Sequence, residues 1–214
     1  MKDTITTKEL ILKKIRKALL EKRENPHPNL EDTPLYVKND SELEFLFAEQ
    51  LTAVSGKFVY CENGIELMEN LLELAERNEW KKIFCWEPEL QDILSKYEFP
   101  FLKSSKDFEL ADVGITLCEA LIARNGSVLL SNKNQSGRRL SIYPHQHVVI
   151  AKTSQLVLDL KDGLKVIKDK YGAQIPSMIS NITGPSRTAD IEKTLVLGAH
   201  GPKDLFVFLV DDLS

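Results

Sequence analysis

The chain has 214 residues, of which 43% are hydrophobic and 28% charged, and its formal net charge is −4. This length suffices for one substantial core, and the composition is that of an ordinary globular protein. No apolar run approaches the roughly 20 residues of a membrane span. Nucleic acid is not expected as a partner, because phosphate binding relies on clustered Lys and Arg.

The lysines at the start of the chain are interrupted by acids, and no apolar signal core with a cleavage site follows them. We therefore expect a cytoplasmic protein. Whether it forms a homo-oligomer is left open.

The three cysteines, Cys61, Cys85 and Cys118, lie far apart, each inside an apolar stretch, and form no C-x-x-C pair. This pattern is typical of reduced core thiols, so we expect no metal and no cofactor. His145 and His147 would share one face of a strand, which keeps a metal pair geometrically open, but a third ligand is not identifiable.

Residues 1–39 are expected to form an N-terminal helix and a proline-rich arm. Pro26, Pro28 and Pro34 cannot continue a helix. We expect the basic residues of the first 24 positions to form a solvated helix face, because the apolar residues opposite them repeat at helical spacing: Ile11, Ile15, Ala18 and Leu19.

Residues 40–214 are expected to form one α/β domain, because strand-like and helix-like patterns alternate along them. The predicted strands cover residues 58–61, 83–86, 99–102, 147–151 and 205–210, with a strand, a turn and another strand over 111–130. The predicted helices cover residues 43–54, 65–77, 88–97 and 159–171, and one short helix follows residues 175–182. We predict an open, mostly parallel sheet with helices on both faces, in which ligands bind beyond the carboxyl ends of the strands.

Residues 181–192, NITGPSRTADIE, follow a strand-like run and are predicted to open the short helix. The free N–H groups of a helix start attract anions, and Ser186 and Arg187 would add a hydroxyl and a planar fork. The alternative is structural: Gly184 and Pro185 form a turn, Ser186 or Thr188 caps the helix, and Asp190 and Glu192 satisfy its first turn.

Two other segments carry polar groups that could act on a ligand. His200, beside Gly201 at the expected helix end, could shuttle a proton or merely complement the helix dipole. Arg138 or Arg139, in the loop between two strands, could hold an anion. Glu119 could serve as a nucleophile or base, but a solvated glutamate at a strand end is the better interpretation.

Four segments resemble the LUD-domain family: ADVGIT at 111–116, GSVLLS at 126–131, GRRLSIYPHQHVVIA at 137–151, and TGPSRTADIE with LGAHGP at 183–202. The resemblance covers roughly residues 40–212. It implies a fold like that of the group formed by CoA transferases, ribose-5-phosphate isomerase and formyltetrahydrofolate cyclo-ligase. It also implies a role in oxidising L-lactate to pyruvate, beside partner subunits that bear iron–sulfur clusters. Arg124 stands where many relatives have a glutamate, so a CoA-transferase mechanism through that position is not expected.

Two hypotheses follow, and whether the chain is an enzyme stays open between them. In the first, it is a non-redox component of a lactate-oxidation system that binds a small anionic ligand or its iron–sulfur partners. In the second, it is a stand-alone enzyme acting on a phosphorylated, CoA-linked or folate-like substrate. The expected catalytic residues are His200 and Asp190. The expected ligand-binding residues, which should converge at one end of the sheet, are Gly184, Pro185, Ser186, Arg187, Thr188, Gly201 and Arg138.

Overall fold

The computed structural model describes residues 6–20, 26, 41–136, 138–188 and 196–212. The chain divides into two units, residues 1–40 and 41–214, and each is described by itself. In the first unit, helix α1 spans Thr7–Leu20 and buries none of its side chains. Its start is a reciprocal cap, in which Thr6 N donates to Glu9 Oε2 at 2.7 Å and Glu9 N donates to Thr6 Oγ1 at 3.3 Å.

The second unit is built on a five-stranded sheet in the order β1-β11-β6-β3-β2. All neighbours in this sheet are parallel. The strands are β1 (Lys57–Cys61), β2 (Ile83–Cys85), β3 (Val113–Thr116), β6 (Gln146–Lys152) and β11 (Asp204–Val210). Helices α2 (Leu43–Ala53), α3 (Gly64–Arg77) and α4 (Pro88–Lys96) pack around it. Because parallel strands need crossovers, α3 links β1 to β2 and α4 begins just after β2.

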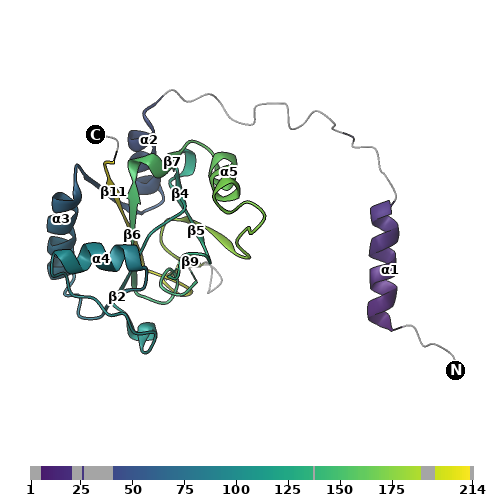
Figure 1. The fold of residues 1–214 in the computed structure, drawn as a ribbon, viewed down its shortest axis with the longest axis horizontal. Coiled ribbons are helices and arrows are strands. Elements are labelled where there is room, and N and C mark those ends of the chain that lie inside the picture. The colour runs from purple at the N-terminus through teal and green to yellow at the C-terminus, as the bar shows by residue number, and fades with distance from the viewer. Residues whose placement is uncertain (1–5, 21–25, 27–40, 137, 189–195, 213–214) are drawn as a thin grey trace. The chain divides into compact units, whose positions relative to one another are not determined.

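The alternation of side chains along each strand gives this sheet two apolar faces. On β11, Phe206 and Phe208 face the core that α3 and α4 cover. The intervening residues Leu205, Val207 and Leu209 face a second core, which includes Leu46, Phe47 and Leu51 of α2. Both faces are therefore covered, and β11 reads as the continuous apolar run expected of a strand buried on both sides. Figure 1 shows α3 and α4 on one side of β6 and β11.

A second, four-stranded sheet in the order β7-β4-β5-β8 shares that second core. Its strands are β4 (Ala120–Ile122), β5 (Ser127–Ser131), β7 (Leu156–Val157) and β8 (Ile179–Thr183). Helix α5 (Leu160–Tyr171) packs against it, and a Cβ at Gly163 would lie 2.6 Å from both Ile122 and Leu129 side chains. The described residues of this unit also include the 3₁₀ turns η2 (Phe108–Leu110), η3 (Ala123–Asn125) and η4 (Thr153–Gln155).

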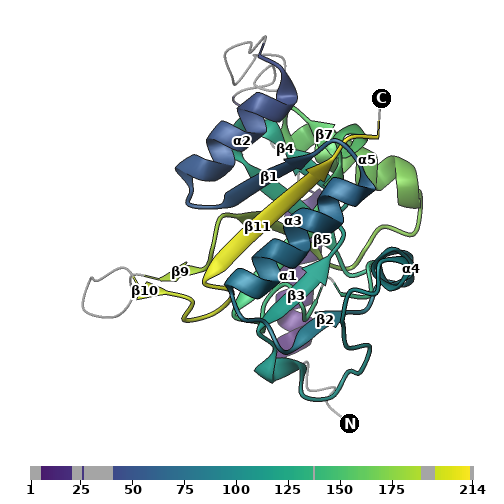
Figure 2. The same ribbon diagram turned by 90° about the vertical axis from the view of Figure 1, so that its left-hand side faces the viewer.

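The structure confirms the predicted α/β class and the mostly parallel sheet, and it corrects three local predictions. Residues 111–130 hold three strands rather than two, with Gly114 inside β3. Residues 99–102 contribute only an isolated bridge, from Leu102 to Phe84. The prediction of a short helix after residue 182 is wrong for the described residues, because β9 (Arg187–Thr188) pairs antiparallel with β10 (Val196–Leu197). Figure 2 shows these two short strands projecting from the body of the unit.

No helix in the described ranges is both long and apolar enough to cross a membrane.

Candidate functional site

A cavity of about 410 Å³ lies beyond the carboxyl ends of the parallel strands. Leu117 follows β3, Lys152 ends β6 and Val210 ends β11, and all three line it. Parallel strands that begin at one edge all end at the opposite edge, where open α/β sheets bind their ligands. We call this space the carboxyl-end cavity.

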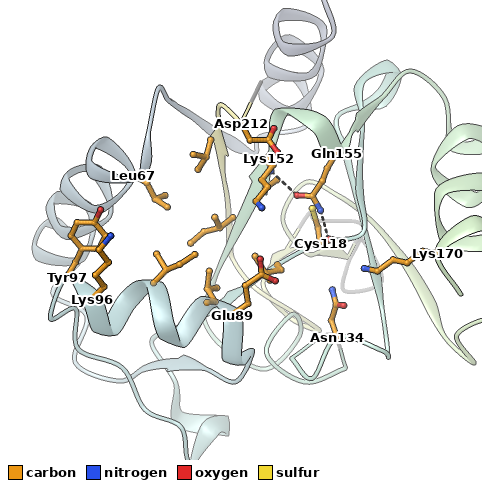
Figure 3. A pocket seen from close by; sticks show the side chains of 17 residues that line it. Leu67, Glu89, Lys96, Tyr97, Cys118, Asn134, Lys152, Gln155, Lys170 and Asp212 are labelled. Atoms are coloured by element: carbon orange, nitrogen blue, oxygen red, sulfur yellow. Dashed lines mark hydrogen bonds between the residues drawn. The ribbon is translucent and has the colours of Figure 1, made fainter. Parts of the chain in front are cut away.

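The lining of the carboxyl-end cavity combines an apolar wall with polar groups. Its apolar residues include Leu67, Leu90, Ile93, Leu117, Ile150 and Val210. Its polar residues include Glu89, Lys96, Tyr97, Asn134, Lys152, Gln155, Lys170 and Asp212. In Figure 3, Leu67, Lys96 and Tyr97 lie on one side of the cavity and Lys170 and Asn134 on the opposite side.

Local sequence fixes the two helices that wall the cavity. Asn63 caps α3 by accepting hydrogen bonds from the N–H groups of Ile65 and Glu66 at 2.9 and 3.1 Å. Gly64, the first residue of α3, lines the cavity, and a Cβ there would meet only Tyr97 Oη, at 3.8 Å. Pro88 starts α4, a position where its missing N–H costs nothing.

Lys170 is held at the cavity wall by a buried carboxylate. Glu119, whose side chain is fully buried, accepts from Lys170 Nζ at 2.8 Å, Tyr171 Oη at 2.8 Å and Ser131 Oγ at 2.5 Å. Burial raises the pKa of Glu119, but these donors outweigh it and leave that pKa below its usual value. The prediction of a solvated glutamate is therefore wrong, since β4 and β5 place Glu119 inside the core.

The turn that follows β6 is fixed by one amide side chain, that of Gln155, and one carboxylate side chain, that of Asp212. Gln155 Nε2 donates to the Cys118 carbonyl at 2.7 Å, and its Oε1 accepts from Lys152 N at 2.8 Å. Asp212 accepts from Ser154 N at 2.9 Å and Ser154 Oγ at 2.7 Å, which lowers the pKa of this carboxyl. The ends of β3, β6 and β11 are thus tied together, and the cavity floor is fixed before any ligand arrives.

The cysteine thiols near the cavity are protonated at neutral pH. Cys118 lines the cavity, and burial raises its pKa far above the usual range. Burial likewise raises the pKa of Cys85 to about 12. Because the thiolate is the nucleophilic form, neither group is an activated nucleophile in this environment.

Glu87 is a buried carboxyl that no sequence argument singled out. It follows β2 at the start of α4, and its side chain is shielded from solvent. Its Oε2 accepts from Leu117 N at 3.3 Å, whereas Oε1 has no hydrogen-bond partner among the described residues. Burial raises the pKa of Glu87 to about 7. The available sequence signal was a glutamate directly after a buried strand and before a helix-starting proline.

A smaller pocket of about 220 Å³ lies at the opposite, amino end of the sheet. It lies beside His147 and Leu205, the second residues of β6 and β11. Its lining includes the sequence-predicted residues Gly184, Pro185, Ser186, His200 and Gly201. Ser186 N donates to the Pro202 carbonyl and Gly198 N donates to the Ser186 carbonyl, both at 2.9 Å. We call this space the 184–202 pocket.

The other sequence-predicted residues that the structure describes do not line this pocket. The Arg187 guanidinium donates to the Val54 carbonyl, and Thr188 belongs to β9. Arg138 donates to Ser177 Oγ at 3.2 Å and lines a separate hollow. Asp190 lies outside the described residues. Because β9 and β10 replace the expected helix start, the described residues offer no helix dipole to an anion here.

The two histidines before and within β6 have different environments. His145 is exposed, whereas His147 is buried and its Nε2 lies 2.9 Å from Thr116 Oγ1. Burial lowers the pKa of His147 to about 3, so its ring is neutral at physiological pH. They therefore do not form the paired face that a strand would give, and no group of three potential His, Cys, Asp or Glu ligands occurs in the part of the chain described.

The model of the LUD domain matches residues 46–210, which include the lining residues of both cavities except Asp212. This chain belongs to the LUD domain family. Similar proteins include Lactate utilization protein C of Shouchella clausii, 32% identical over 80% of each chain. The Exiguobacterium sp. protein of the same name is 29% identical over 98% of each chain.

The fold is also similar to a solved structure. The crystal structure of a DUF162 family protein from Deinococcus radiodurans superposes with a TM-score of 0.60, covering 81% of this chain and 99% of that one. The two sequences are 17% identical, so this similarity supports the fold alone.

Proposed function

We propose that this LUD domain chain is a non-redox component of an L-lactate oxidation system. The observation that carries this proposal is end-to-end similarity: the Exiguobacterium protein named Lactate utilization protein C aligns with 98% of the chain. This similarity spans nearly the whole of both chains and is therefore not confined to one shared motif.

The cysteines support the non-redox part of the proposal. The chain has only three, whereas iron–sulfur clusters are ordinarily held by four cysteine ligands. All three are buried and follow different strands: Cys61 ends β1, Cys85 ends β2, and Cys118 comes after β3. The electron-transfer steps of lactate oxidation would therefore take place on iron–sulfur partner subunits.

The carboxyl-end cavity is the proposed seat of a small anionic ligand. Lys96, Lys152 and Lys170 line it, and Lys170 is held in place by the buried Glu119. A preorganised ammonium at the wall of a partly apolar cavity is an effective partner for a carboxylate or phosphate, because the lysine loses little further freedom on binding.

Deletion of the gene tests the role, with growth on L-lactate as the readout. We expect the deletion strain to grow on glucose and fail on L-lactate, and the intact gene to restore growth. The double variant Glu119→Gln with Lys170→Met should not restore growth, whereas Lys165→Met, on the same helix but outside the cavity lining, should. Normal growth of the deletion strain on L-lactate would overturn the proposal.

A second candidate function is favoured by the 184–202 pocket. Gly184, Ser186, His200 and Gly201 come from two separate segments and line one small space, with an exposed histidine at its edge. Such a pocket could serve a stand-alone enzyme acting on a phosphorylated, CoA-linked or folate-like substrate, with His200 as the acid or base. Turnover of such a substrate by the purified protein, lost in His200→Ala, would favour this function over the first.

A further inference from the structure

The ligand of the carboxyl-end cavity can be described more closely from the size and polarity of that space. We infer that it is an organic anion larger than lactate, with a single acidic group beside Lys170 and an apolar body directed toward α3 and α4. This inference rests on the proposed ligand-binding function and specifies the ligand class of the same site.

Size gives the first argument. Pockets of about 300–1,000 Å³ enclose ligands of drug size, and this cavity has a volume of about 410 Å³. Lactate and pyruvate are three-carbon acids and would leave most of that space to water. A cavity walled by apolar side chains gains binding energy when an apolar group displaces such water.

The distribution of polar groups gives the second argument. Leu67 and Tyr97, from α3 and the end of α4, lie on one side of the cavity together with Lys96, and Lys170 and Asn134 lie on the other (Figure 3). Lys96 is exposed, whereas Leu67 is buried, so the interior of this side is apolar. Leu90 and Ile93 of α4 add to the apolar wall. A ligand that is apolar at one end and acidic at the other would match this arrangement.

Lys170 is the residue best placed to receive the acidic group. Its side chain is 53% exposed, whereas the Glu119 side chain that holds it is 0% exposed. An ammonium carries three N–H donors, so the contacts of Lys170 with Glu119 and Tyr171 do not exhaust it. Asn134, opposite the apolar wall, supplies an amide that can donate a second hydrogen bond.

The charge balance of the lining limits the ligand to one acidic group. Three lysines, Lys96, Lys152 and Lys170, face two acids, Glu89 and Asp212, and Glu119 lies behind Lys170. Asp212 is ionised and engaged by Thr153 and Ser154, so it remains negative at neutral pH. A polyanion such as a nucleoside triphosphate would find too little positive charge here.

Fluorescence of 1-anilinonaphthalene-8-sulfonate tests the inference directly, because this probe joins one sulfonate to an aromatic body. We expect saturable binding to the folded full-length protein, and displacement by octanoate at concentrations at least about tenfold below those needed with L-lactate, because only octanoate buries an apolar chain. Equal displacement by octanoate and L-lactate, or no saturable binding, would overturn the inference.

Two variants locate the binding. Glu119→Gln with Lys170→Met removes the charge pair together, so that no buried carboxylate is left unpaired, and should weaken probe binding by about tenfold or more. Gly64→Leu should abolish binding by occupying the space beside Tyr97, since nothing lies closer than 3.8 Å to a Cβ there. Lys165→Met is the matched control and should bind as the original protein does. Unchanged binding in both cavity variants would overturn the assignment.

The binding experiment and the growth experiment test different claims, so either one can fail while the other succeeds. If the deletion strain grows normally on L-lactate while the probe binds as expected, the lactate role is wrong and the ligand class stands. If growth depends on the gene but the probe and octanoate do not bind, the role stands and the ligand class is wrong.

Discussion

The carboxyl-end cavity and the 184–202 pocket lie at opposite ends of the same parallel strands, and they are constructed differently. The cavity gathers charged and amide side chains from residues between 64 and 212, none of which forms a recognisable local motif. The pocket is formed mainly by two short segments rich in glycine and proline. The difference shows that a conspicuous motif marks where the backbone is constrained, whereas a site of side-chain chemistry can be scattered through the sequence.

The largest expected effect is on stability, and it arises because the backbone is constrained at Gly184 of the 184–202 pocket but not at Gly64 of the carboxyl-end cavity. Gly184 has φ +73°, and a Cβ there would lie 2.3 Å from the Val54 carbonyl oxygen. We expect Gly184→Ala to destabilise the protein by about 3 kcal/mol or more, because the strain and the backbone contact add. Gly64→Ala in the cavity should change stability by less than about 0.5 kcal/mol, as for an unconstrained position. Urea unfolding measures both, and equal effects would remove the distinction.

A second prediction uses the opposite pH dependence of Glu87 and His147. Burial raises the pKa of Glu87 to about 7, so its contribution to stability is complete below its ordinary pKa of 4.5 and is lost as pH rises toward 7. Burial lowers the pKa of His147 to about 3, so stability is lost as pH falls below its ordinary value of 6.5. Between pH 4.5 and 6.5 the two effects oppose each other.

Each single substitution should therefore reveal a dependence of stability on pH that largely cancels in the original protein. Glu87→Gln should become more stable as pH rises from 4.5 to 6.5, by roughly 1 kcal/mol per pH unit. His147→Gln should become less stable over the same range. Urea midpoints measured at half-unit pH intervals test this, and parallel curves for the original protein and both variants would show that neither group is desolvated as described.

A third prediction decides which region serves growth on L-lactate. We expect His200→Ala to restore growth to the deletion strain, while Glu119→Gln with Lys170→Met does not. His200 is exposed, so its removal should change stability by less than about 0.5 kcal/mol. The reverse pattern of growth would transfer the function to the 184–202 pocket.

The smallest expected effect concerns Arg187. Its guanidinium donates to the Val54 carbonyl from an exposed position, so it serves as a brace between β9 and the end of α2. We expect Arg187→Ala to cost about 1 kcal/mol of stability and to leave probe binding unchanged. Loss of probe binding without a change in stability would instead make Arg187 a ligand contact.

The spacing of apolar residues predicted the α/β unit well. Its helices bury one apolar face, and its central strands carry continuous apolar runs because both sides of the sheet are covered. The boundaries of α3, α4 and α5 differ from the predicted ones by a residue. Residues 187 and 188 were misjudged because a Gly-Pro turn followed by serine and arginine suits a helix start and a hairpin equally well.

The candidate site was less predictable than the fold. Glu119 was identified as chemically able, but its burial depends on β5 and α5, which supply Ser131 and Lys170 from 12 and 51 residues away. Nothing local to Lys152, Gln155 or Lys170 distinguishes them from solvated residues. Their convergence is a property of the topology, since the parallel order of β3, β6 and β11 brings their ends together.

Helix α5 is secured at three places along its length. Arg124 pairs with Asp159 at its start, Gly163 lets it approach β4 and β5 closely, and Lys170 and Tyr171 bond to Glu119 at its end. A helix that is held at both ends in this way has little freedom to tilt or slide. The Lys170 ammonium would therefore stay in one position when a ligand binds. The cavity should then select ligands by length as well as by charge.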